Sequence, residues 1–222
     1  MLFRSAAVVG VSFAVDESAL LEPVDAVGDG SARDEGLGRE LAGGEGVGVA
    51  GTAEGGEDVE LPELEADLAA AQKTLSANPK DAEAMIWVGR RYGYLWRFRD
   101  AIAMFSEGIA LYPDNPKFYR HRGHRYISIR EFAKAQADFE KAAALIKGKP
   151  DEIEPDGAPN PAGKPRSTLQ FNIWYHLALS HYLQGNYAKA YDAWVECMKV
   201  STNDDSVVAT SDWTWMTLMR LN

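Results

Sequence analysis

The sequence contains little of what disulfide frameworks, metal sites and membrane spans require. Its single cysteine, Cys197, excludes an internal disulfide framework. His121 and His124 lie about one helical turn apart, but no nearby cysteine or carboxylate completes the roughly four ligands of a zinc site. An apolar run over residues 6–15 is too short to cross a bilayer. We also find no catalytic motif in a supporting context, and therefore predict no metal, no cofactor and no enzymatic activity.

Residues 16–60 lack aromatic side chains. Residues 16–60 are rich in Gly, Ala, Asp and Glu and show no helical period. Such a segment cannot bury enough apolar surface to offset the entropy lost on ordering. We therefore predict that residues 1–60 form a flexible, acidic, Gly-rich tail and that residues 61–222 form the folded part. Residues 1–15 weakly resemble a secretion signal cleaved after Ala14; the alternative, which we favour slightly, is a mobile terminus in the cytosol.

The charge of the chain is unevenly distributed. The net charge is −10, yet residues 80–147 carry 13 basic and 8 acidic side chains. Residues 1–79 carry 4 basic and 16 acidic side chains. The middle of the folded part is therefore predicted to be basic, and most of the acidity lies in the leading segment.

What the sequence does contain is one pattern of small and aromatic residues written three times. The first two copies differ by a shift of 34, and the third follows the second at a shift of 55. The recurring residues that we assign to repeat packing are Gly89, Tyr92, Ala101 and Phe105, then Gly123, Tyr126, Ala135 and Phe139, then Ala178, Ala190 and Trp194. A long fixed period of this kind is typical of stacked supersecondary units. The shift of 55 leaves an insertion over residues 148–166 between the second and third copies.

Each copy resolves into two helical stretches. Apolar residues recur at helical spacing over residues 85–95 and again over residues 98–111. Asn115 before Pro116, Asn186 before Tyr187, and Ser167 before the third copy are predicted helix starts. Glycine or alanine at one position of each copy allows the paired helix to approach closely, and the aromatic residues fill the space around it. Residues 61–78 and 205–222 are half units at the two ends.

These residues resemble the tetratricopeptide repeat (TPR) family. The pattern of that family appears as Met85-x2-Val88-Gly89-x2-Tyr92, followed by Ala101-x3-Phe105 and Pro113. The resemblance implies an all-α fold, a right-handed α-solenoid of antiparallel helix pairs. It would contain about three full units and a half unit at each end.

In this family, the first helix of each pair lines a concave groove that holds a peptide or a partner helix. The resemblance therefore implies a basic, aromatic-lined groove, and its register places there Arg90, Tyr94, Lys117, Arg120, His124, Asn172, Tyr175 and Tyr182. Arginine forks suit carboxylates, and Arg and Tyr are favoured at binding hot spots. The alternative is a solvated helix face whose arginines pair with Glu or Asp of the neighbouring unit.

The insertion offers a second hypothesis. It contains five prolines and the acidic residues Asp151, Glu152, Glu154 and Asp156. Its acidic start could lie against the basic first helix of the second copy and compete with a partner. The alternative is a solvated spacer between the second and third copies.

The leading prediction is a protein-interaction module or scaffold, whose partner is an acidic or extended peptide, a C-terminal carboxylate or a helix. One alternative is a nucleic-acid-binding repeat, against which the net charge of −10 argues. Another alternative is an enzyme domain that uses the groove as a pocket. Residues 205–222 are apolar around most of a helix, so we also predict self-association through this segment.

Overall fold

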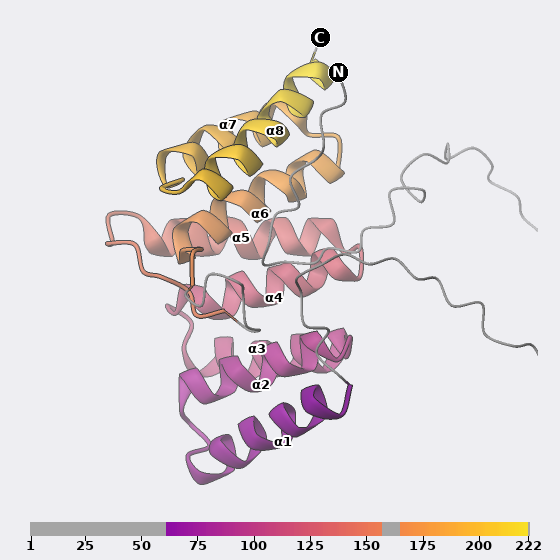
Figure 1. Cartoon of the computed structure of the whole chain (residues 1–222), viewed down its shortest axis with the longest axis vertical. Coiled ribbons are helices and arrows are strands. Elements are labelled where there is room, and N and C mark those ends of the chain that lie inside the picture. The colour runs from indigo at the N-terminus through magenta and orange to yellow at the C-terminus, as the bar shows by residue number, and fades with distance from the viewer. Residues whose placement is uncertain (1–60, 157–164, 222) are drawn as a thin grey trace, which may run out of the picture. The chain divides into compact units, whose positions relative to one another are not determined.

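The computed structural model describes residues 61–156 and 165–221. The predicted tail and the central part of the insertion therefore lie outside the described residues. Within these ranges the chain is all-helical apart from one isolated β-bridge (Figure 1). The helices are α1 (Leu61–Ala77), α2 (Ala82–Tyr94), α3 (Phe98–Leu111), α4 (Pro116–Ser128), α5 (Phe132–Ile146), α6 (Leu169–Leu183), α7 (Tyr187–Lys199) and α8 (Asp204–Leu221).

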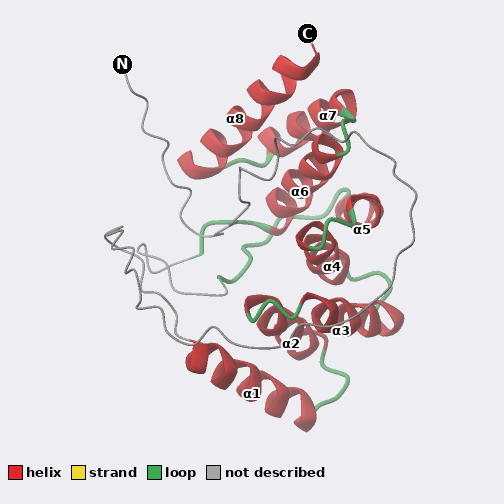
Figure 2. Ribbon diagram, turned by 90° about the vertical axis from the view of Figure 1, so that its right-hand side faces the viewer, coloured by secondary structure: helices red, strands yellow, loops and turns green. Residues whose placement is uncertain are grey.

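Each helix packs against the next one along the chain, from α1 to α8 (Figures 1 and 2). The first helices of successive pairs, α2, α4 and α6, also lie side by side, and α8 continues this layer beside α6. The pairs are α2–α3, α4–α5 and α6–α7, with α1 and α8 as half units. The predicted solenoid of about three full units with a half unit at each end is confirmed.

The helix starts follow from local capping. Oδ1 of Asn115 accepts a hydrogen bond from the backbone N of Lys117 at 3.0 Å, with Pro116 in the first turn of α4. The predicted start at Ser167 was wrong by one residue. Thr168 precedes α6, and its Oγ1 accepts from the backbone N of Phe171 at 3.3 Å. α7 begins at Tyr187 as predicted, but the side chain of Asn186 makes no capping hydrogen bond.

Small residues set the distance between the two helices of a pair. A Cβ atom added to Gly89 would lie 2.3 Å from Cε1 of Phe105, and one added to Gly123 would lie 2.9 Å from Cε2 of Phe139. Both phenylalanines are fully buried. In the third pair the equivalent residues are Ala178 and Trp194, each with no exposed surface. The remaining repeat-packing positions are the fully buried Ala101, Ala135 and Ala190, and the half-buried Tyr92 and Tyr126.

Small residues also pack against the neighbouring helix between one unit and the next. A Cβ atom on Gly108 of α3 would lie 2.1 Å from the ring of Phe118 in α4. Ala142 and Cys197 occupy the corresponding face of the next two units, and both are fully buried. Cys197 is a small packing residue, as its register predicts, and burial raises the pKa of its thiol to about 12.

The turn inside each pair requires a left-handed backbone. Trp96 has φ of 60°, Arg130 has φ of 61° and Gly185 has φ of 75°. These residues stand at one register position in the three copies. Only the third copy has glycine there, the residue for which this conformation costs least.

Candidate functional site

The candidate site is a set of polar side chains on α2, α4 and α6 that contact residues 149–156. We call residues 149–156 the strap, and the surfaces of α2, α4 and α6 that it contacts the inner face. The strap follows α5 and is extended. Its backbone pairs with the segment that leads into α6, because the backbone N of Glu154 donates to O of Ser167 at 3.0 Å and that of Leu169 donates to O of Glu152 at 2.9 Å. Ile153 and Thr168 form the isolated antiparallel bridge between them.

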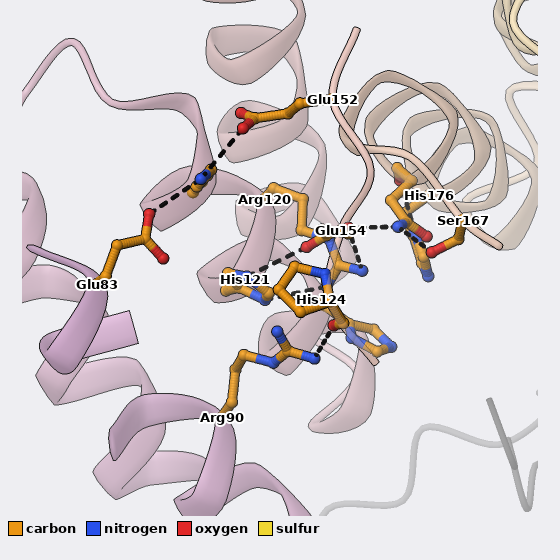
Figure 3. Close-up of polar contacts among 12 residues, drawn as sticks. Glu83, Arg90, Arg120, His121, His124, Glu152, Glu154, Ser167 and His176 are labelled. Atoms are coloured by element: carbon orange, nitrogen blue, oxygen red, sulfur yellow. Dashed lines mark hydrogen bonds and ion pairs between the residues drawn. The ribbon is translucent and has the colours of Figure 1, made fainter. Parts of the chain in front are cut away.

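Glu154 is the buried anchor of the strap. The residue is 5% exposed, whereas Asp151, Glu152, Ile153 and Pro155 are exposed. Figure 3 shows its carboxylate between side chains of α4 and α6. Oε2 lies 3.0 Å from Nη2 of Arg120 and accepts a hydrogen bond from Nδ2 of Asn172, and Oε1 lies 3.2 Å from Nε2 of His121. A carboxylate this deeply buried needs such partners.

The hydrogen bonds define the tautomer of His121. Nη1 of Arg120 lies 3.1 Å from Nδ1 of His121, and a guanidinium can only donate. Nδ1 therefore accepts, and the ring proton is placed on Nε2, the atom nearest Glu154. Burial, followed by repulsion from Arg120, lowers the pKa of His121 well below its usual value, so the ring is neutral near pH 7.

Two more contacts extend the site to a second acidic residue and to the strap backbone. Nζ of Lys117 lies 2.9 Å from Glu83 and 3.3 Å from Glu152. Nη2 of Arg90 donates to the carbonyl O of Pro155 at 2.7 Å and to the hydroxyl of Tyr94 at 3.2 Å. The strap is thus held by α2 through Arg90, by α4 through Lys117 and Arg120, and by α6 through Asn172.

Arg125 adds a cation that the strap does not neutralise. It is half-buried, and its Nη2 lies 2.6 Å from Nδ1 of His124. Burial, followed by repulsion from Arg120, lowers the pKa of Arg125 to about 10. Among the residues that the structure describes, no carboxylate pairs with it. Beside the strap-binding residues Arg90 and Arg120 there is thus one further positive charge that the strap does not balance.

The predicted groove residues divide into two groups. Arg90, Lys117, Arg120 and Asn172 contact the strap directly, and Tyr94 contacts Arg90. His124 is buried beside His176, with ring centroids 4.6 Å apart. Tyr175 and Tyr182 instead pack edge-on against aromatic rings of α7 and α8, with centroids 5.2 Å from those of Trp194 and Trp213.

Sequence reasoning did not select three residues of the site, namely His121, Arg125 and Glu154. His121 was considered as a metal ligand and not as a groove residue, and the register did not place Arg125 in the groove. The acidic run contains Glu154, but nothing in a loop without periodicity indicates which of its carboxylates is buried.

Three arginines that could otherwise contact phosphates already pair with carboxylates. Arg91 lies 2.8 Å from Asp67, and Arg97 lies 2.7 Å from Asp100. Arg122, which occupies an apolar position of the repeat pattern, binds Asp138 through two parallel bonds of 2.8 and 2.7 Å. Of these pairs only Arg91–Asp67 joins two neighbouring units, and all three leave fewer cations available for phosphates.

Three further findings concern metal binding, membrane spans and self-association. The described residues contain no group of three or more His, Cys, Asp or Glu arranged to hold a metal ion. None of the described helices is long and apolar enough to cross a membrane. On α8, Trp215 is 63% exposed and Met219 is 60% exposed. Self-association through this helix stays a prediction.

Comparison with solved structures places the fold among known proteins. TTC0263, a thermophilic TPR protein of Thermus thermophilus, matches with a TM-score of 0.55 and 16% sequence identity, covering 72% of this chain and 77% of that chain. The chain has the tetratricopeptide-repeat fold. YrrB, a TPR protein with an unusual peptide-binding site, matches with a TM-score of 0.54 and 16% identity, covering 70% and 68% of the two chains. No family model and no curated protein matches the chain.

A third TPR structure contains a bound partner. The TPR2B domain of yeast Sti1, in its complex with pHsp70, matches with a TM-score of 0.50 and 15% identity, covering 63% of this chain and 97% of that chain. At these identities the three structures establish a common fold.

Proposed function

We propose that this TPR chain is a protein-interaction scaffold whose inner face binds an extended, acidic segment of a partner protein. The observation that carries the proposal is the burial of Glu154 among Arg120, His121 and Asn172. These side chains come from α4 and α6 and converge on one carboxylate. A constellation that accepts an acidic segment of its own chain has the chemistry to accept another.

Two further observations support this proposal. The strap binds in an extended conformation and is contacted by three successive first helices. A stack of repeats would bind a linear peptide in the same way. Arg125 contributes positive charge for which the described residues supply no carboxylate. YrrB has a peptide-binding site by its description, and the Sti1 domain was solved with pHsp70, so peptide binding occurs on this fold.

The test is binding of labelled peptides to the full chain at low and physiological salt, measured by fluorescence anisotropy. An extended peptide with several Glu residues is compared with the same peptide carrying Gln and with one carrying Lys. We expect only the acidic peptide to bind. We expect Arg125→Gln to weaken its binding by roughly 10- to 100-fold, because a hydrogen bond to a charged group contributes roughly 1.5–3 kcal/mol.

The matched control is Arg99→Gln, which makes the same change at an exposed position of α3. Circular dichroism establishes that both variants remain folded. Equal affinity for the Glu and Gln peptides, or equal losses in Arg125→Gln and Arg99→Gln, would contradict the proposal.

A further inference from the structure

We propose that the strap is an internal competitor: it occupies the inner face and must be displaced before a partner segment binds there. This inference rests on the proposed function. It adds a way in which partner binding is regulated and a sequence motif for the partner segment. Its starting point is that one segment of the chain already satisfies Arg90, Lys117, Arg120 and Asn172 at once.

The strap is attached in the manner of a ligand and not of a core element. Glu154 is its single buried residue, and Ile153, its aliphatic side chain, is 65% exposed. The strap thus adds little to the hydrophobic core, and its hold on the inner face consists of hydrogen bonds and ion pairs. Contacts of this type can be exchanged for equivalent contacts to another acidic segment without exposing apolar surface.

The spacing of the contacts defines the motif. In an extended chain, residues two apart point to the same side, and on a helix, residues three apart are neighbours. Glu152 and Glu154 therefore face Lys117 and Arg120, which lie one turn apart on α4. Arg90 then takes the carbonyl of the next residue, Pro155. The partner segment we infer is extended and carries two acidic residues separated by one other residue.

Tethering makes the competition effective. The strap is covalently joined to the end of α5, so its local concentration at the inner face is on the order of millimolar, as for short linkers. A partner peptide binds only the fraction of molecules whose strap is open, and its apparent dissociation constant rises in inverse proportion to that fraction. Weakening the strap should therefore strengthen binding in trans.

The experiment uses the full chain and a fluorescein-labelled heptapeptide with the sequence of residues 150–156. The test variant is Glu152→Gln combined with Glu154→Gln, which removes both charges of the strap and keeps its shape. We expect it to bind the peptide about tenfold more tightly than the unchanged chain. Glu196→Gln, the same chemical change in an exposed ion pair of α7, should bind like the unchanged chain. A heptapeptide with Gln at both Glu positions should bind none of them.

A second measurement does not depend on the stability of that variant. Ile153→Cys introduces an exposed thiol, while Cys197 is fully buried, so a spin label attaches at position 153. We expect the label to become more mobile when the unlabelled heptapeptide is added, and to remain unchanged when the Gln peptide is added.

The possible outcomes separate the two proposals. Equal affinity of the unchanged chain and the double variant, or an immobile label at saturating peptide, overturns the competitor and leaves the scaffold proposal standing. Peptide binding to neither chain overturns both. Tighter binding by the double variant together with release of the label supports both.

Discussion

The packing of Gly89 against Phe105 gives the sharpest test of how this fold is held together. A methyl group at Gly89 would meet three ring atoms of Phe105 at 2.3, 2.5 and 2.9 Å. Real contacts are not this short, so the ring or the helix must shift. The ring has little room, because it is 1% exposed and stacks on His121 with centroids 5.5 Å apart. We therefore expect Gly89→Ala to destabilise the protein.

The magnitude follows from two opposing effects. Overpacking a core costs about 1–3 kcal/mol. Alanine in place of glycine inside a helix gains about 1 kcal/mol. For Gly89→Ala, with the severe clash, the free energy of unfolding should fall by about 1–2 kcal/mol. For Gly123→Ala, whose shortest contact is 2.9 Å, the two effects should nearly cancel. In the third copy the native residue is already Ala178, so Ala178→Gly should cost about 1–2 kcal/mol through lost propensity and lost packing.

Urea unfolding followed by circular dichroism gives the three free energies. A double-mutant cycle that combines Gly89→Ala with Phe105→Leu isolates the contact: the smaller side chain should recover part of the loss caused by the methyl group. If Gly89→Ala and Gly123→Ala have the same effect, or if Phe105→Leu recovers nothing, the distance between α2 and α3 is not determined by this pair and the reasoning fails.

Two further predictions concern buried polar groups. Burial lowers the pKa of His176 to about 3, so this ring stays neutral in the folded chain while the unfolded chain takes up a proton below about pH 6.5. The free energy of unfolding should therefore be constant above about pH 7 and should fall by about 1 kcal/mol from His176 alone by about pH 5.5. The other buried histidines should add to this loss. Equal urea midpoints at about pH 7 and about pH 5.5 would contradict the prediction. Nε1 of Trp194 donates to Oγ1 of Thr217 at 3.0 Å in a fully buried pair, so Thr217→Val should cost about 1–3 kcal/mol in urea unfolding by leaving the indole N–H unpaired. Thr214→Val, at a half-buried position of the same helix, should cost less.

The helical architecture could be predicted from the sequence because each unit repeats the same local pattern of small and aromatic residues. Glycine or alanine lies 16 residues before a buried aromatic residue in all three copies, and in the first two copies, as in Gly123 and Phe139, the two are in close proximity. The boundaries of α3 and the capping of α4 by Asn115 follow from short-range patterns. The register also identified Arg120 and Asn172 as facing the same side of the first-helix layer.

The rest of the candidate site could not be derived in this way. The strap has no periodicity, and its path is determined by tertiary contacts, so opposite charge indicated an approach to α4 but not which residue would be buried. Glu154 is enclosed, whereas the neighbouring Glu152 is exposed. Arg125 was missed because its unbalanced charge becomes apparent only once its neighbours are placed.

The strap has a consequence for how the units unfold. In a linear array of repeats each unit stabilises only the unit beside it, so end units can fray separately from the middle. Residues 149–156 break this rule, because they contact Arg90 in the first full unit, Arg120 in the second and Asn172 in the third. Because the strap contacts three units, these units should unfold together. Release of the strap would allow the helix pairs to unfold one after another.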